Sequence, residues 1–188
     1  GGIRDIQFYR FRVTASAGSQ WVGKATLPLK DIVLSDIEWH VRGGTDNEAF
    51  VEQLPAVLSH HGYLGVKGQP ALPAALYGAH MQNAVFNNVR IYWEHPSSVW
   101  RDGILVDHAD GVDFRNLVLR QPQVGFGSAV HLRKSDKINI QGCHAPLGTH
   151  IFMHVEDALP NAKISSAGNN LHDAKQPFLS NAQVDVVP

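Results

Sequence analysis

The sequence of 188 residues is poor in cysteine, in charge and in long apolar runs. Its single cysteine, Cys143, excludes an intramolecular disulfide framework. No apolar run approaches the ~18 residues that a transmembrane helix needs, and no signal peptide is visible. Charged residues make up 18% and the formal net charge is −1. Composition therefore gives no reason to expect nucleic acid or a membrane as a partner.

What the sequence does contain is a repeated motif in which apolar and polar residues alternate. The copies are "IRDIQFYRFRV", "LKDIVLSDIEW", "MQNAVFNNVRI", "ADGVDFRNLVLR", "SDKINIQGC" and a weaker "LPNAKISSA". Their aligned fourth residues are Ile6, Ile32, Ala84, Val112, Ile138 and Ala162. These lie 26, 52, 28, 26 and 24 residues apart. A steady period of this length indicates a solenoid, and the double step means either a cryptic coil or an insertion.

A second strand-like run precedes most copies of the motif. The runs are "ALYGAH" (75–80), "GILVDHA" (103–109), "SAVHLRK" (128–134) and "HIFMHVE" (150–156), each followed by a short polar corner. Two or three short strands in a period of roughly 22–28 residues are typical of one turn of a parallel β-helix. One coil cannot bury its own apolar face, so stacked coils share a core. We therefore predict an all-β parallel β-helix of about six turns, with Ile6, Ile32, Val112 and Ile138 in one interior column.

The organisation along the chain follows from the same pattern. Residues 1–188 are expected to form one β-helix domain, interrupted at 41–73 by an excursion that contains the capping box Thr45–Glu48. The first residues already form a full repeat without a cap, and an open end of a solenoid exposes core and strand edges. We therefore expect the chain to be the C-terminal part of a longer protein, or to pack its first turn against another chain.

Several copies of the motif resemble the C-terminal coils of family 28 glycoside hydrolases, the polygalacturonase-like pectin hydrolases. The resemblance rests on "GAHMQNAVFNNVRIYWE", "DGILVDHADGVDFRNLVLRQP" and the opening "IRDIQFYRFRV", and it covers residues 3–156. It implies a right-handed β-helix, a polysaccharide or oligosaccharide partner that can contain uronate, and an extracellular or periplasmic location. Pectin lyases, pectin methylesterases and phage tailspikes share this architecture, so the fold alone does not give the function.

The catalytic signature of that family is missing from the chain. Inverting hydrolysis uses two carboxyl groups about 6.5–9.5 Å apart, with water between base and sugar. The sequence has no Asp-Asp pair and no Gly-His-Gly, and the nearest string is "HHG" at 60–62. We therefore expect no catalytic residue and no cofactor in this chain, and no pectin hydrolysis by it in isolation.

Two classes of function stay open. The first is a C-terminal β-helix segment of a carbohydrate-active enzyme whose catalytic carboxylates lie upstream. The second is a non-catalytic β-helix that binds carbohydrate or is structural, as in a tailspike or an adhesin. The catalytic motifs upstream of Gly1 in a longer gene would favour the first class.

The stretch "IYWEHPSSVWRDG" is the most site-like part of the sequence. Its candidate sugar-binding residues are Trp93, Glu94, Trp100 and Arg101. Aromatic faces can stack on pyranose rings, and the guanidinium fork of arginine matches a carboxylate. The plainer alternative is that the tryptophans pack the loop onto the solenoid. Because this loop and the excursion both follow an apolar copy of the motif, we expect them to rise from one edge and to flank a groove.

Stacking the second strands brings further candidates together. Asp107 is predicted to lie one turn, about 4.8 Å, from Arg133. His80, His108 and Lys134 would form a neighbouring row. We expect Tyr77, Asp107 and His108 to line the floor or rim of the groove, the alternative being a surface ion pair beside a polar corner.

Histidine is frequent, with 11 residues, so a metal site must be considered. His150, His154 and Glu156 alternate along one strand and would face one side. Zinc or calcium there is the lesser alternative, because a metal site needs closely set ligands. We expect no metal, and instead exposed side chains with Ile151, Met153 and Val155 inside. Cys143 is expected to be a buried structural thiol.

Overall fold

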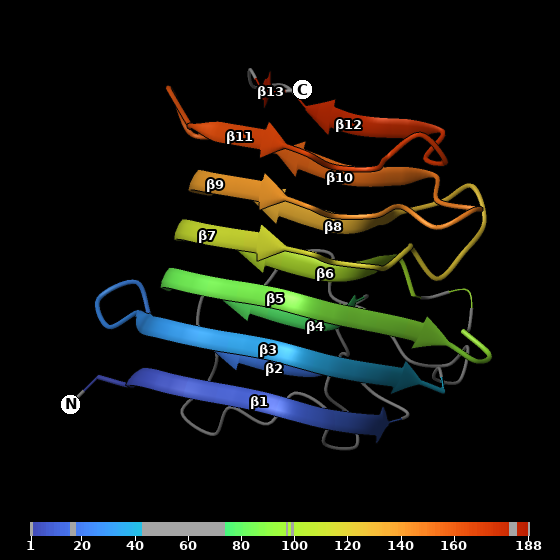
Figure 1. The fold of residues 1–188 in the computed structure, drawn as a ribbon. Helices are drawn as coiled ribbons and strands as arrows, with labels where there is room; N and C mark the ends of the chain where they lie inside the picture. Colours follow the sequence, from blue (N-terminus) through green and yellow to red (C-terminus); the bar gives the residue numbers. More distant parts are fainter. Residues whose placement is uncertain are drawn as a thin grey trace.

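The computed structural model describes residues 2–15, 18–42, 74–96, 98, 100–180 and 184–187, and the only regular elements in these ranges are β-strands. The strands form two parallel sheets (Figure 1). Sheet A consists of β1 (Arg4–Ala15), β3 (Leu29–Val41), β5 (Met81–Trp93), β7 (Asp110–Arg115), β9 (Asp136–Gln141), β11 (Ile164–Ala167) and β13 (Asp185–Val187). Sheet B consists of β2 (Ser19–Val22), β4 (Ala74–Ala79), β6 (Asp102–Asp107), β8 (Ser128–Arg133), β10 (Ile151–Glu156) and β12 (Gln176–Ser180).

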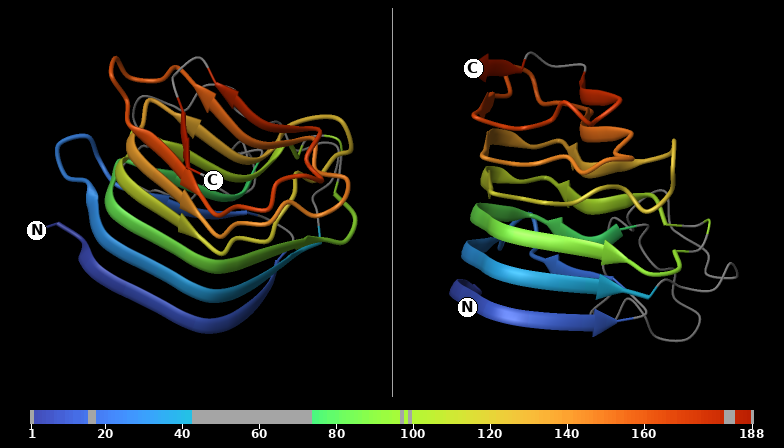
Figure 2. Two further views of the ribbon diagram at one scale, coloured as in Figure 1. Left: turned by 45° about the horizontal axis from the view of Figure 1, so that its top comes forward. Right: turned by 45° about the vertical axis from the view of Figure 1, so that its right-hand side comes forward.

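The chain passes alternately from one sheet to the other and rises by one coil each time. Figure 1 shows the strands of sheet A running one way in front and those of sheet B returning behind them, which makes the winding right-handed. Figure 2 shows the coils stacked along one axis. Sheet B takes five steps between its six strands and sheet A takes six between its seven, so the predicted parallel β-helix is confirmed. No helix among the described residues could cross a membrane.

The predicted interior column is present in sheet A. Its registered partners are Ile6, Ile32, Ala84, Val112, Ile138 and Ile164. All of them are buried except Ile6, which lies in the first coil and is partly exposed. The alignment of Ala162 was wrong, because the strand of the last copy begins two residues later. The double step is an insertion, since β3 and β5 pair directly.

Left-handed backbone conformations mark the corners of each coil. One column of positive φ runs through Arg10, Asp36, Asn88, Asn116, Gly142 and Gly168. A second corner, after β4, β6, β8 and β10, is formed by His80, His108, Lys134 and Asp157. Asparagine, aspartate and glycine tolerate this region, as the corner composition predicts. The first column bends β1, β3 and β5 near their middle, so sheet A has two arms (Figure 2).

Each strand of sheet B alternates between core and outer face in the same way. In β8, Ala129, Val130 and Leu132 belong to the core, whereas His131 and Arg133 are only partly buried. The strand register carries this pattern from coil to coil. In β4, β6, β8 and β10 the outer face of sheet B has three columns, occupied by the first, fourth and sixth residue of each strand.

Two further expectations concern single places in the chain. Cys143 is buried in the core, and burial raises the pKa of its thiol to about 11, which confirms a structural thiol. Val41, the first residue of the excursion, and Trp93 of the aromatic loop are registered partners, so both segments begin at one edge of sheet A. Apart from residues 41 and 42, the excursion lies outside the described residues.

Candidate functional site

Titratable side chains gather on the outer face of sheet B in its middle and later coils. The fourth-residue column reads Tyr77, Leu105, His131 and His154. The sixth-residue column reads Ala79, Asp107, Arg133 and Glu156. The face is thus apolar in its early coils and charged in its later ones. We call the group formed by Asp102, Ser128, His131, His154 and Glu156 the histidine–carboxylate cluster.

Asp102 anchors this cluster from the first residue of β6. Its carboxylate is buried, with 4% of the residue exposed. Oδ1 accepts hydrogen bonds from the backbone N–H of Ser128 at 2.9 Å and from its hydroxyl at 2.6 Å. Oδ2 lies 3.1 Å from Nδ1 of His131. The carboxylate therefore fixes the imidazole of the next coil.

His131 joins a buried carboxylate to an exposed one. Its Nε2 lies 3.1 Å from Oε2 of Glu156, whose side chain is 46% exposed. When the ring is protonated it donates to both carboxylates. Its face stacks on His154 with ring centroids 4.5 Å apart and an interplanar angle of 17°. Ser128 bonds Asp102, and Nε2 of His131 is taken by Glu156, so these groups do not have the arrangement of a nucleophilic serine triad.

A second charged group lies beside the first in the sixth-residue column. Arg133 Nη2 donates to Oδ2 of Asp107 at 3.2 Å, as the stacking of the strands predicts. Oδ1 of Asp107 is buried and has no hydrogen bond, although Nδ1 of His108 lies 2.9 Å away. The row of His80 and His108 is confirmed, with ring centroids 5.0 Å apart.

The residues predicted in the aromatic loop have different surroundings. Trp100 is fully buried in the core and contacts Trp93 edge to face at 5.4 Å. Trp93 is partly buried and donates its Nε1–H to the carbonyl of Arg120. The expectation that Trp100 stacks on sugar is therefore wrong, because its faces are covered by core side chains. Glu94 lies 3.7 Å from Arg42, and Arg101 lies over the ring of Phe126 at 5.3 Å.

Tyr77 is the second predicted contact that burial corrects. It is 1% exposed and packs with Ala74, Ala79 and Leu105 in a cluster outside the main core. Burial and the charge of Asp107 raise the pKa of its phenol. Its ring is thus not available as the floor of an open groove.

The structure also divides the predicted groove. Arg101 immediately precedes β6, whereas Asp107 ends it and His108 follows it. Asp107 lies six residues after Arg101, which is roughly 20 Å along the strand. These residues can line one long surface but not one compact pocket.

Sequence reasoning missed Asp102 and the central position of His131. The signal was present, because Asp102 and Ser128 occupy the same place in two successive copies of the second strand. Glu156 was considered only with His150 and His154 as a metal ligand. Among the described residues, no group of three or more His, Cys, Asp or Glu side chains is arranged to hold a metal.

The histidine–carboxylate cluster gives a pH-dependent prediction. Burial, and then the nearby His131, lower the pKa of His154 from 6.5, while Glu156 and Asp102 oppose this. The unfolded chain therefore takes up the proton first as pH falls. The stability that His154 contributes should be complete above about pH 6.5 and decrease as pH falls towards its lower folded pKa. Urea unfolding at pH 7.5 and 5.5 measures this loss.

The matched variants for this test are His154→Gln and His95→Gln. His154→Gln should lose less stability between the two pH values than the native chain. His95→Gln replaces an exposed histidine and should show the pH response of the native chain. An unchanged pH response in His154→Gln would show that the stacked ring does not cause the effect.

Comparison with known proteins adds one distant likeness. No protein-family model and no curated protein matches the sequence. A solved structure, the enzymatically active domain of tailspike protein 2 of bacteriophage CBA120, aligns at 10% identity with a TM-score of 0.33. The alignment covers 98% of this chain and 40% of that one. So distant a likeness assigns neither family nor activity, and the resemblance to family 28 glycoside hydrolases stays an interpretation of the sequence.

Proposed function

We propose that this chain is a β-helix module of a carbohydrate-active or tailspike-like protein, and that it binds a saccharide chain along the outer face of sheet B. The observation that carries the proposal is the histidine–carboxylate cluster with the neighbouring Arg133. Saccharides present dense hydroxyl groups that both donate and accept hydrogen bonds. Glu156 supplies an exposed acceptor and Arg133 supplies donors one coil away.

The stacking of coils suits an extended ligand. Registered residues on adjacent strands lie about 4.8 Å apart, so Arg133 and Glu156 present polar groups one coil apart along the axis, while His131 holds Glu156 in place. Asp102 does not need to touch the ligand. Its hydrogen bonds to Ser128 and His131 hold the imidazole in one orientation, which lowers the entropy cost of binding.

Binding is favoured over hydrolysis by the arrangement of the carboxylates. Glycoside hydrolysis by inversion requires space for water between two carboxyl groups. Here the imidazole of His131 contacts both Asp102 and Glu156, and Asp102 is buried. We therefore propose that the catalytic step, if the whole protein has one, depends on residues outside this face.

The experiment is calorimetric titration of the chain with neutral and acidic oligosaccharides. Glu156→Gln and Arg133→Gln should each weaken binding about tenfold, because each removes a charge-assisted hydrogen bond. Lys137→Gln, which removes an exposed ion pair with Asp110 on sheet A, should bind as the native chain does. Unchanged affinity in both sheet B variants would contradict the proposal.

The same samples test the expected lack of pectin hydrolysis. Incubation with polygalacturonate should release no reducing ends. Release that is lost in Glu156→Gln, Asp107→Asn or Glu94→Gln would instead assign an active site to this chain.

A further inference from the structure

A second polar surface lies on sheet A, away from the face just described. A hollow of about 460 Å³ opens where β1, β3 and β5 bend, and its lining includes Phe11 and Ile37. Its polar lining forms two rows across three coils, Arg10, Asp36 and Asn88, then Arg12, Glu38 and Arg90.

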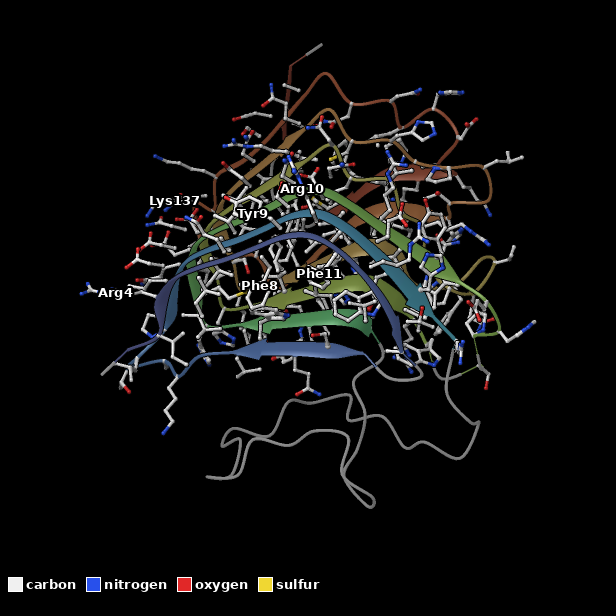
Figure 3. All side chains as sticks on the ribbon, turned by 60° about the horizontal axis from the view of Figure 1, so that its bottom comes forward. Arg4, Phe8, Tyr9, Arg10, Phe11 and Lys137 are labelled. Carbon is white, nitrogen blue, oxygen red and sulfur yellow. The ribbon has the colours of Figure 1, made fainter. Side chains whose placement is uncertain are left out.

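The backbone path places the two rows on either side of the bend. Arg10, Asp36 and Asn88 have φ of 54°, 59° and 49°, and the strands turn at these residues. The residues two positions later, including Arg90, therefore lie on the other arm of the bend. Figure 3 shows Arg10 directed outward from β1, while Phe8 and Phe11 point into the solenoid.

The two carboxylates of the hollow already have partners. Asn88 Nδ2 donates to Oδ1 of Asp36 at 2.8 Å. Arg12 Nε donates to Oε2 of Glu38 at 2.6 Å, and this hydrogen bond is the main cause that holds the pKa of Glu38 below its usual value. Glu38 is thus paired with a guanidinium, whereas Asp36 keeps its charge and, among the described residues, has no guanidinium within 4.0 Å.

Arg10 and Arg90 are the two arginines of the hollow whose guanidinium groups have no close partner among the described residues. Within the described ranges, neither makes an ion pair within 4.0 Å or a side-chain hydrogen bond, although the charge of Arg90 contributes to lowering the pKa of Glu38. Three guanidinium groups face two carboxylates, so the hollow is locally positive. A guanidinium offers paired donors in a plane, the geometry that a carboxylate or sulfate accepts.

An exposed aromatic ring borders the hollow. Tyr92 lies two residues after Arg90 on β5, about 7 Å further along the same face. Tyr92 is 42% exposed, and its ring stacks on the ring of His40 with centroids 4.9 Å apart. The stack holds the phenol ring in place, with surface left for a sugar.

We propose that this hollow binds the anionic group of an acidic saccharide, a carboxylate or a sulfate, through Arg10 and Arg90, with Tyr92 against the sugar ring. The inference rests on the proposed function only in taking a saccharide as the carrier of the anion. It adds a second binding surface with its own residues and its own ligand preference.

The test is calorimetric titration with an oligogalacturonate, its methyl ester of the same length, and a sulfated oligosaccharide. The native chain should bind an acidic ligand at least tenfold more tightly than the ester, and the preference should shrink as salt is raised. Arg10→Gln and Arg90→Gln should each remove most of the preference, about tenfold, while binding of the ester stays unchanged. Comparison of the two acidic ligands identifies the preferred anion.

The matched control is Arg115→Gln, an exposed arginine of sheet A that pairs with Asp113 outside the hollow. It should keep the native preference. Equal binding of ester and acid, or a full preference in both hollow variants, would overturn the inference. If Glu156→Gln weakens all ligands while the hollow variants change none, the sheet B proposal stands and the hollow inference fails.

Discussion

Phe114→Ala should lower the free energy of unfolding by about 3–5 kcal/mol, the range typical of a large aromatic side chain removed from a core. Phe114 is fully buried in β7 and stacks on Phe86 of the preceding coil with ring centroids 5.3 Å apart. Ile140 of the following coil is its other registered partner. The truncation therefore leaves a cavity between three coils. Urea denaturation monitored by circular dichroism measures the loss.

The position of Phe114 in a middle coil extends the effect of the cavity to the neighbouring coils. Each coil contacts only its neighbours, so a weakened middle coil lowers the coupling between the two halves. Total stability of a domain is only about 5–15 kcal/mol, and the loss is a large share of it. Leu147→Ala removes an aliphatic side chain that is 84% exposed and should cost less than about 0.5 kcal/mol. A similar cost for both variants would contradict the stacked core.

Asp102→Ala should destabilise the chain by about 2–4 kcal/mol, because it leaves buried donors without an acceptor. The lost bonds are those from the backbone and hydroxyl of Ser128 and the contact with His131. The same change frees the imidazole, so saccharide binding on sheet B should weaken together with stability. Chemical denaturation and calorimetric titration of one sample measure both effects.

Two companion variants separate charge from shape. Asp102→Asn keeps an acceptor for Ser128 but loses the negative charge facing His131, so it should retain more stability than alanine while still weakening binding. Asp113→Ala removes a carboxylate that pairs with Arg115 on the surface of sheet A, and should cost about 0–1 kcal/mol. If Asp102→Ala binds the saccharide with native affinity under conditions where the variant is fully folded, the buried carboxylate does not organise the site.

The first coil exposes apolar side chains that a further coil or another chain could cover. Phe8, Tyr9 and Ile3 are exposed, and Ile6 and Val13 are only partly buried. Among the described residues no strand pairs with the outer edge of β1, so its backbone groups could pair with a further parallel strand. The sequence analysis expects an upstream coil or another chain to pack here, and this stays a prediction. The exposed side chains place the expected contact on β1.

Periodicity in the sequence was enough to predict the fold, because the solenoid repeats one local pattern. The period of the motif placed Ile32, Val112 and Ile138 in one column, and the strand register confirms it. The stacking of Asp107 on Arg133 followed from the same arithmetic. Such contacts join equivalent positions of successive copies, so sequence spacing is enough to find them.

Tertiary structure alone decided which faces are open and which side chains meet across columns. The sequence predicts that Trp100 stacks on sugar, yet its side chain is fully buried among core residues. Asp102 and His131 stand at different places in their own strands, and they meet because the side chain of one reaches the neighbouring column of the next coil. The arginine hollow arises from a bend in three strands. Periodicity specifies the register of the coils, whereas burial and the bend depend on the packed side chains and the backbone path.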